Sequence, residues 1–326
     1  MFFRLLNADQ VASLLSMDEL IDAMKGALRR FSAGEVVQPV RTVLAAGDHE
    51  LFGVMPALIR DPAAMGVKLV TVFGGNAGFG LPTHLATICL MSPHTGALVA
   101  VMDGTRITEA RTAAVSAVSA RVLARDDCSV MAIIGSGVQA RSHLVAMEHV
   151  FELSEIRVWS PTPDHQYAFI TEMEAETQTK IIGSDSADRA VNGADVVVLA
   201  TSSAEPVVQS EWVASGAHVV SIGACRPNQR EMDPALVRRG RVFVDSRAAA
   251  LVESGDVVMG INDGQFTSSH IAGELGEVLA GTVEGRRSAR EITIFKSLGL
   301  AVEDLVAADM VYRRAIAQDL GEEIEM

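Results

Sequence analysis

The opening segment of the chain has the apolar spacing of an amphipathic helix. Over Asn7–Phe31, apolar side chains recur three or four positions apart, which places them on one side of a helix. These positions are Val11, Leu14, Leu15, Leu20, Met24 and Leu28. Asp18 stands where a helix N-cap is expected, and Gly34 follows where a helix would stop. The pattern therefore predicts helical structure up to Phe31.

The pattern changes to short apolar runs, broken by proline and glycine, over residues 36–101. Several strand-like runs joined by turn residues predict an antiparallel or mixed sheet. The runs are 41–44, 51–55, 66–72, 86–90 and 97–102. Asp103 and Gly104 then indicate a turn, and Thr108 can cap an alanine-rich helix from Glu109 to about Ala124.

From Asp127 onward, apolar strands alternate with helical segments. The expected strands are 130–134, 156–159, 180–182, 195–200, 218–222 and 242–245. The expected helices are 138–150, 164–176, 187–190 and 248–254. This alternation is typical of a parallel, doubly wound sheet.

The tail, from Glu291 to about Gln318, has helical spacing, with Phe295, Leu298 and Val302 on one side. We expect this helix to return to the first domain. The fold prediction is thus α/β, with a Rossmann dinucleotide-binding domain over 123–297. An α+β domain is expected from 1–122 together with 298–326.

Composition narrows the classes of partner. The chain has 326 residues, 49% of them hydrophobic and 21% charged, and a formal charge of −14. These values indicate a globular protein and argue against nucleic acid or an anionic membrane as the main partner. Its three cysteines, Cys89, Cys128 and Cys225, form no metal-binding or redox pair, as expected of reduced thiols. With no signal peptide and no run of ~18–20 apolar residues, we expect a cytoplasmic protein.

The segment Gly135-Ser136-Gly137-Val138-Gln139-Ala140 is a candidate dinucleotide-binding turn. It directly follows the apolar strand 130–134 and opens the next helix. Gly135 permits a tight turn, Gly137 lets backbone N–H groups approach a pyrophosphate, and Ala140 allows close helix–strand packing. The helix N-terminus would then bind the phosphates. The alternative is a structural glycine turn without a ligand.

The end of the second strand bears on the choice of cofactor. An NAD-preferring site usually carries an acid there to bond the ribose 2′-hydroxyl, whereas this chain has Ser160, Pro161 and Thr162. The two hydroxyls tolerate a 2′-phosphate, so NADP is favoured over NAD. Pro161 stands where an NADP enzyme often keeps an arginine. Thr162 could equally be the N-cap of the helix that starts at Pro163.

Three cations of the first domain lie in apolar or small-residue settings. Arg41 starts a strand, and Lys68 sits inside another, where burial is costly without an anion. Arg111 and Thr112 are expected in the first turn of the helix after Thr108, where a cation is unfavourable unless an anion binds. Together the three could hold a carboxylate and the cofactor phosphates. For any one of them, a surface or ion-pair role is the alternative.

The histidines and nucleophile motifs do not indicate a further catalytic site. His84 could contact the cofactor or be a satisfied core histidine. The eight histidines show no metal-ligand spacing, and no nucleophile-elbow motif occurs.

Motifs along nearly the whole chain resemble the ornithine cyclodeaminase/mu-crystallin family. They include QPVRTV (38–43), GVMPA (53–57), KLVTVF (68–73), AVMDGTRITEARTAAVSA (100–117), IGSGVQARSH (134–143), GACRPNQREMD (223–233), VDSRAAALVESGDV (244–257) and FKSLGLAVEDLVAA (295–308). The mu-crystallin branch of ketimine reductases is the most similar. The resemblance implies a first domain that binds substrate and forms a homodimer, partly through its sheet, beside the Rossmann domain.

The resemblance also implies roles for residues. The positions matching Arg41, Lys68 and Arg111 hold the substrate carboxylate in that family. The positions implied to touch the cofactor are Thr83, His84, Arg111, Thr112, Gln139, Ser160, Thr162, Ile222 and Lys296. We add Gly135, Gly137 and Val138 from the turn, and Thr201, as cofactor candidates.

One departure from the family pattern bears on the reaction. Cyclodeaminases carry an aspartate where this chain has Cys225, a candidate substrate contact. Without that carboxylate, reduction of a C=N bond by NAD(P)H is favoured over cyclisation of ornithine. The expected substrate is a small α-imino acid or a cyclic ketimine carboxylate, with Lys68 also able to assist proton delivery to nitrogen. The rival hypotheses are an amino-acid dehydrogenase or iminosuccinate-type reductase, a true cyclodeaminase, and a non-catalytic cofactor-binding protein.

Overall fold

The computed structural model describes residues 2–47 and 50–326. Contacts divide the chain into two compact units, the first comprising Met1–Arg111 with Gly299–Met326 and the second Thr112–Leu298. Along the chain, the first boundary between the two units lies between Arg111 and Thr112, inside helix α3 (Thr105–Leu123). The sequence pattern placed this boundary near residue 122.

The first unit is built on a mixed sheet, as the sequence predicts. Its strand order is β16-β1-β7-β6-β5-β4-β2, and β3 also pairs with β4. The β1–β7 pair is parallel and all the other pairs are antiparallel. The strands are β1 (Phe2–Leu6), β2 (Val36–Val37), β3 (Thr42–Ala45), β4 (Leu51–Arg60), β5 (Ala63–Val72), β6 (His84–Met91), β7 (Leu98–Asp103) and β16 (Glu322–Glu325). A 3₁₀ turn, η1 (Gly74–Phe79), connects β5 to β6.

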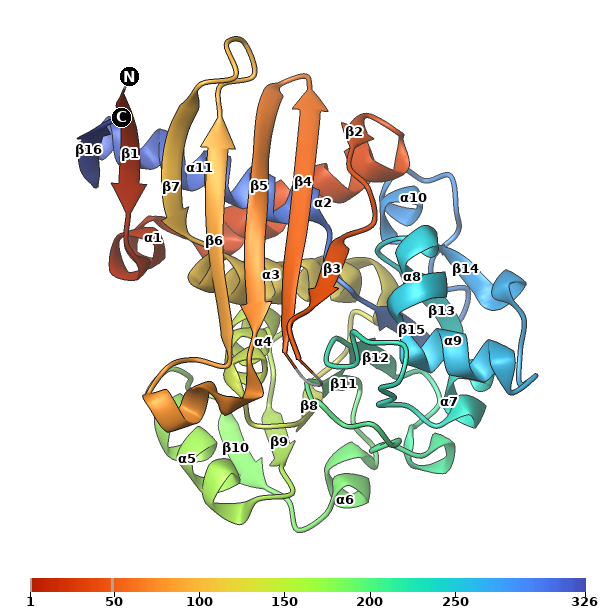
Figure 1. Ribbon diagram of the computed structural model, residues 1–326. Coiled ribbons are helices and arrows are strands. Elements are labelled where there is room, and N and C mark those ends of the chain that lie inside the picture. Colours follow the sequence, from red (N-terminus) through yellow and green to blue (C-terminus); the bar gives the residue numbers. More distant parts are fainter. Residues whose placement is uncertain (1, 48–49) are drawn as a thin grey trace. The chain divides into compact units, whose positions relative to one another are not determined.

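Helices cover one face of this sheet. Helix α11 (Ala301–Gln318) packs against β4, β5, β6 and α2 (Met17–Ser32) (Figure 1). The sheet strands alternate buried and half-buried residues, as expected when one face is covered and the other is not. The C-terminal helix thus returns to the first unit, as predicted.

The predicted first helix is two helices, α1 (Ala8–Leu14) and α2. Asn7 caps α1 in a capping box with Gln10, and the N-cap of α2 is Ser16, so the assignment of Asp18 as N-cap was wrong. The extended backbone at Leu15 and Ser16 interrupts the helical hydrogen bonds although the apolar spacing continues. Gly34 follows α2 with a φ of 76°, consistent with its predicted role as a stop.

Helix α3 begins four residues earlier than the sequence suggested. The Asp103 carboxylate accepts the backbone N–H of Arg106 at 2.8 Å, so Asp103 caps the first turn. Thr108 is not the cap: it lies inside the helix, and its hydroxyl donates to the Gly104 carbonyl at 2.7 Å. Arg111 and Thr112 therefore lie in the second turn, and the argument from an exposed helix N-terminus does not apply to them.

The second unit contains the predicted Rossmann sheet. All its pairs are parallel, in the order β10-β9-β8-β11-β12-β15-β13-β14. The strands are β8 (Val130–Ile134), β9 (Glu155–Trp159), β10 (Lys180–Gly183), β11 (Val196–Leu199), β12 (His218–Ser221), β13 (Arg241–Val244), β14 (Ile271–Glu274) and β15 (Thr293–Lys296). The order reverses between β8 and β11, and ligands of such sheets bind outside the carboxyl ends of strands at this switch point.

Helices and 3₁₀ turns connect these strands. They are α4 (Val138–Glu148), α5 (Pro163–Met173), α6 (Ala187–Val191), η2 (Ser210–Trp212), α7 (Pro234–Arg239), α8 (Arg247–Glu253), α9 (Gly255–Asn262), η3 (Ser268–His270) and α10 (Leu275–Leu279). The prediction of one helix from Glu291 to Gln318 was wrong at its start, because Thr293–Lys296 is the fully buried strand β15. Among residues 2–47 and 50–326, none of the helices combines the length and apolar character that a membrane span requires.

Candidate active site

Lys68 is the centre of a buried charge cluster in the first unit. It lies in the middle of β5 and is 3% exposed. Its ammonium is 2.6 Å from Asp304 Oδ2, and it donates to the Thr108 hydroxyl at 3.4 Å. The anion that a buried lysine requires is therefore supplied by the chain itself, from the first turn of α11.

Arg111 joins the same cluster from α3. Its Nε donates to Asp304 Oδ1 at 2.9 Å, and its Nη1 donates to Glu303 at 2.8 Å. Gly299, with a φ of 84°, passes so close that a Cβ there would lie 2.5 Å from Arg111 Nη1. Glycine at 299 thus leaves the space that the guanidinium occupies.

Arg41 approaches from the segment before β3. Its Nη2 donates to the Gly299 carbonyl at 3.1 Å, and its charge acts on Lys68. The first unit therefore brings together the three cations singled out from the sequence. It adds three groups that the sequence analysis did not single out for this site: Thr108, Glu303 and Asp304.

The pKa values of Lys68, Asp304 and His84 are all lowered in this charge cluster. Burial lowers the pKa of Lys68 to about 8; the nearby Arg111 and Arg41 act in the same direction, and Asp304 opposes them. Despite its burial, Asp304 has a pKa below its usual value, because Arg111 and Lys68 stabilise its charge. Burial, reinforced by Lys68 and Arg111, also lowers the pKa of His84, the first residue of β6, to about 4. Near pH 7 the histidine is therefore neutral and Lys68 can release a proton.

The dinucleotide turn lies in the second unit between β8 and α4. Gly135 has a φ of 111°, and a Cβ there would lie 2.4 Å from the Ala200 carbonyl, so only glycine fits. Gly137 is the N-cap of α4, no side chain caps that helix, and a Cβ on Gly137 would meet nothing within 4 Å. The backbone at Gly137 and the exposed Val138 is therefore open to a ligand, as a pyrophosphate requires.

Gln139 supplies a further polar group beside this turn. Its side-chain oxygen is buried and has no hydrogen-bond partner among the described residues. Such an orphaned acceptor fits a donor on a bound ligand. The turn and Gln139 thus have the features that a dinucleotide would use.

The end of β9 is as the sequence predicts, without an acid. The Ser136 hydroxyl donates to Ser160 Oγ at 3.0 Å, and the Ser160 N–H donates to Gln166 at 3.1 Å. Thr162 occupies the N-cap position of α5 but makes no side-chain cap bond. Its exposed hydroxyl is therefore not used by the helix.

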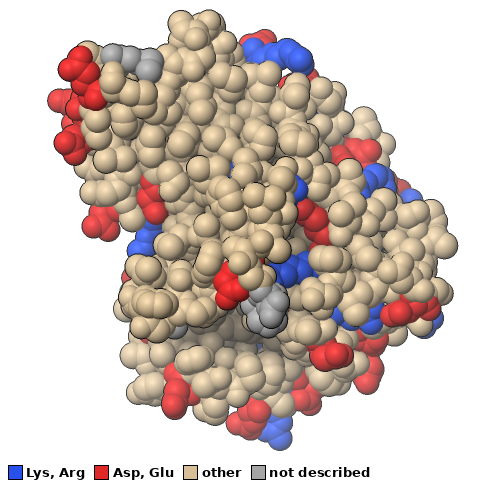
Figure 2. Space-filling model, viewed as in Figure 1, with Lys and Arg blue, Asp and Glu red and all other residues tan. Residues whose placement is uncertain are grey.

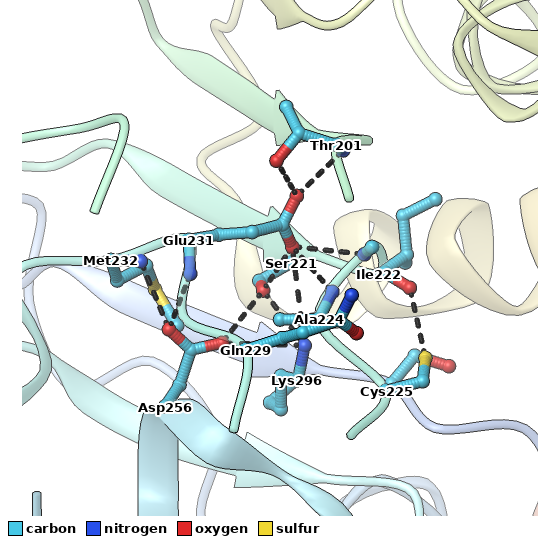
Figure 3. A network of polar contacts seen from close by, with 12 residues as sticks. Thr201, Ser221, Ile222, Ala224, Cys225, Gln229, Glu231, Met232, Asp256 and Lys296 are labelled. Carbon is cyan, nitrogen blue, oxygen red and sulfur yellow. Dashed lines mark hydrogen bonds and ion pairs between the residues drawn. The ribbon is translucent and has the colours of Figure 1, made fainter. Parts of the chain in front are cut away.

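A buried polar network joins the carboxyl ends of β11, β12 and β15 (Figure 3). Lys296 is fully buried, and its ammonium lies 3.0 Å from Ser221 Oγ, 3.4 Å from Asp256 and 4.0 Å from Glu231. Asp256 also accepts the backbone N–H groups of Glu231 and Met232, both at 2.9 Å. The two carboxylates raise the pKa of Lys296 against the effect of burial, so it stays charged.

Glu231 ties the loop after β12 to the end of β11. It accepts the N–H groups of Thr201 at 2.7 Å, Gly223 at 2.9 Å and Ala224 at 3.2 Å. A Cβ on Gly223 would lie 1.9 Å from the Thr201 carbonyl, so the loop and the strand end touch directly. Burial raises the pKa of Glu231. This network fixes the positions of Thr201, Ile222 and Lys296, all cofactor candidates.

Cys225 lies in the same loop, half-buried, and its thiol donates to the Ile222 carbonyl at 3.2 Å. Thr83 is exposed just before β6, and Thr112 is largely buried on α3. No cluster of three or more histidine, cysteine or acidic residues that could hold a metal occurs among residues 2–47 and 50–326.

Four acids of the site, Asp304, Glu303, Glu231 and Asp256, are not among the residues predicted from the sequence. Two acids in the first turn of a helix are a common stabilising feature and do not by themselves indicate a site. A usable signal for Glu303 and Asp304 was their position between apolar residues that face the sheet. For Glu231 and Asp256 the spacing carries no signal, because Ser221, which contacts both carboxylates, is 10 and 35 residues away.

Known proteins are similar to this chain in sequence and in structure. A profile of the ornithine cyclodeaminase/mu-crystallin family matches residues 4–319. Ketimine reductase mu-crystallin of Mus musculus is 41% identical over 312 residues, which cover 94% of this chain and 96% of the relative. The Thermococcus litoralis Delta(1)-pyrroline-2-carboxylate reductase, solved with NADH and L-proline, has a TM-score of 0.96 and 36% identity, covering 99% of this chain and 100% of that one.

An archaeal alanine dehydrogenase dimer with bound NAD has a TM-score of 0.95 and 34% identity, with both chains fully covered. The family profile matches residues in both units. The chain belongs to the ornithine cyclodeaminase/mu-crystallin family.

Proposed function

We propose that this chain is an NAD(P)H-dependent reductase of the C=N bond in a small α-imino acid or cyclic ketimine carboxylate. The observation that carries the proposal is the pairing of Lys68 and Arg111 on one buried carboxylate, Asp304. A proton donor and a carboxylate-binding guanidinium are thereby held side by side. Relatives named as ketimine and pyrroline-2-carboxylate reductases support the same reaction.

The residues of the first unit supply orientation and the proton. Arg41 and Arg111 pair with the substrate carboxylate, since a guanidinium matches its geometry. Lys68 donates a proton from Nζ to the substrate nitrogen, because its pKa of about 8 leaves it protonated but acidic near neutral pH. Neutral His84 adds no charge. A dinucleotide held at Gly135–Gln139 would supply a hydride for the imine carbon, which together with the proton from Lys68 would give the amine.

We further propose that the cofactor binds at Gly135–Gln139 and that NADP is preferred over NAD. The support for NADP is the lack of an acid after β9 and the unused hydroxyl of Thr162. The named structures hold NADH and NAD, so the preference needs measurement. The measurement compares the kcat/KM for NADPH with the kcat/KM for NADH, using the same imine substrate.

The rival reactions differ in what the loop after β12 must provide. A cyclodeaminase needs a free carboxylate there, but this chain has Cys225, and Glu231 and Asp256 are buried and bonded to backbone N–H groups. A linear imine remains the second candidate substrate, favoured by the similarity to an alanine dehydrogenase. The complete charge cluster argues against a protein that only stores cofactor.

The proposal includes a homodimer formed through the sheet of the first unit. The face of β4–β7 turned away from α2 and α11 carries half-buried apolar side chains, including Val54, Val67, Leu69 and Val101. Figure 2 shows this area largely free of charged side chains. An uncovered apolar sheet face is a candidate association surface.

The direct test measures NADPH and NADH oxidation with four substrates. They are Δ1-pyrroline-2-carboxylate, Δ1-piperideine-2-carboxylate, and pyruvate or oxaloacetate with ammonia. Turnover of a cyclic imine supports the main proposal, and turnover of only the keto acids with ammonia supports the linear alternative. If no imine is reduced while ornithine yields proline, the proposal is wrong.

Arg41→Ala should abolish turnover and leave cofactor affinity unchanged. The matched control is Arg106→Ala, because Arg106 is an exposed arginine paired with Glu109.

A further inference from the structure

The carboxylate of Asp304 holds two different cations at once. Its Oδ2 lies 2.6 Å from Lys68 Nζ, and its Oδ1 accepts Arg111 Nε at 2.9 Å. The residue is 1% exposed. Because the two oxygens belong to one rigid planar group, the separation of the ammonium and the guanidinium is fixed by it.

The position of Asp304 is itself well determined. It lies in the first turn of α11, where the helix dipole stabilises a negative charge. The Gln38 side chain accepts the N–H of Val302 at 2.8 Å and so caps this turn. Gly299 allows the chain to enter the helix beside Arg111. The carboxylate is therefore aimed at the cluster by the start of the helix.

We propose that Asp304 is the positioning residue of the site, which holds Lys68 as proton donor and Arg111 as carboxylate ligand in one fixed geometry. This inference rests on the proposed function, in which Lys68 and Arg111 have those two roles. Asp304 does not exchange a proton with substrate; it acts through its two partners.

The groups that face Lys68 come from three elements and from the segment before β3. Asp304 lies on α11, Arg111 and Thr108 on α3, Arg41 before β3 and His84 on β6. Asp304 is the carboxylate that favours the charged form of Lys68, whereas Arg111, Arg41 and burial oppose it. Removal of the Asp304 charge should therefore make Lys68 lose its proton at lower pH.

Glu303 provides a matched control from the neighbouring position. It is as buried as Asp304 and pairs with Arg111 at 2.8 Å, but it is not among the main influences on Lys68. Asp304→Asn and Glu303→Gln both remove a buried carboxylate from Arg111. Only the first also removes the carboxylate from Lys68.

The decisive measurement is the titration of Lys68 itself, followed by ¹³Cε NMR in protein with labelled lysine and no added ligand. The chain has only four lysines, so the Lys68 signal can be assigned with Lys68→Met. In Asp304→Asn the midpoint should move to lower pH by about one unit or more, whereas Glu303→Gln should leave it in place. An unmoved midpoint in Asp304→Asn overturns the inference.

Steady-state kinetics provide the second readout. The rate of imine reduction falls at high pH, and this fall should occur at lower pH in Asp304→Asn. The KM for the imine should rise in both Asp304→Asn and Glu303→Gln. Asp304→Glu keeps the charge but moves it by one methylene, so it should keep the wild-type titration and lower kcat. This variant also serves if Asp304→Asn does not fold; a wild-type kcat in Asp304→Glu would then overturn the inference.

Failure of the proposed function gives a different result. If Lys68→Met reduces imines as well as the wild type does, Lys68 is not the donor and the proposed function loses its proton step. The NMR titration does not depend on turnover. The role of Asp304 in holding Lys68 and the role of Lys68 in the reaction are thus tested separately.

Discussion

At the residue scale, the buried environment of Lys68 sets the charge and the pKa of this side chain. A lysine on a buried strand would normally be destabilising, but a carboxylate at 2.6 Å compensates its charge. Burial still lowers its pKa to about 8, which moves proton release into the range where an enzyme operates. The same lysine would be an unremarkable cation if it lay on an exposed strand.

This pKa predicts the pH dependence of the reaction. A donor must be protonated, and the protonated fraction of Lys68 falls as the pH rises through about 8. The kcat of imine reduction should therefore fall above about pH 8. Lys68→Arg keeps the charge but cannot release a proton, so it should lower kcat by about 10²–10⁴-fold with a smaller change in KM.

The control for this experiment is Lys25→Arg, at an exposed position of α2. It should leave both kcat and the pH profile unchanged. A Lys68→Arg variant with wild-type kcat would contradict the assignment of the proton donor.

At the scale of elements, the turn between β8 and α4 distinguishes a glycine needed for folding from one needed for binding. At Gly137 a methyl group has free space and the backbone has an ordinary conformation, so Gly137→Ala should fold normally. Its methyl would stand where a pyrophosphate approaches, and the dissociation constant for NADPH should rise about tenfold or more. Fluorescence titration with NADPH checks this.

Gly135→Ala is the contrasting variant. Its Cβ would lie 2.4 Å from the Ala200 carbonyl at a positive φ, so thermal stability should fall along with binding. If Gly137→Ala bound NADPH with wild-type affinity, the cofactor would not approach the chain at this turn.

The elements also show what the sequence can predict. The strands β8 to β13 of the second unit were foreseen because most are short apolar runs between turn residues, whereas β14 was not foreseen. β15 was read as helix because it is buried on both faces, so it lacks alternation, and the apolar residues after it have helical spacing. Lys68, Arg111 and Arg41 were foreseen as functional cations in apolar or small-residue settings. Asp304, the carboxylate partner of Lys68 and Arg111, was not, because 193 residues separate it from Arg111 along the chain.

At the scale of the whole molecule, buried neutral histidines predict sensitivity to acid. Burial lowers the pKa of His84 and His143 to about 4 and that of His218 to about 3, from an ordinary 6.5. The unfolded chain therefore binds more protons than the folded one between pH 6.5 and these values. Stability should be constant with respect to these groups above pH 6.5 and should fall as the pH drops below it.

The measurement is the free energy of urea unfolding at several pH values between 8 and 5. Below pH 6.5, His143→Gln should reduce the slope of the unfolding free energy against pH. The reduction should be up to about 1.4 kcal/mol per pH unit, which corresponds to one proton. His165→Gln, at an exposed position, should leave the slope unchanged. An equal slope in wild type and His143→Gln would show that this histidine does not contribute.

The uncovered sheet face makes a prediction about assembly. Val67 lies on β5 opposite Pro56 and Cys89, near the centre of that face. Val67→Glu would place a charge in the proposed dimer surface, so sedimentation should show monomers where the wild type forms dimers. Tyr167→Glu, at a 73% exposed position of α5, should leave the dimer intact. A dimeric Val67→Glu would place the association surface elsewhere.

The place of β15 in the sheet has a consequence for biosynthesis. This strand, Thr293–Lys296, lies between β12 and β13, which precede it by many residues, and α11 covers a sheet made of N-terminal strands. Neither unit can be completed until residues 293–318 have been synthesised. Until then, β12 and β13 have apolar edges without their partner, and long loops must close before the central pairing forms. The nascent chain should therefore depend on chaperones until residues 293–318 emerge, and a stop before residue 293 would remove β15 from the second unit and α11 from the first.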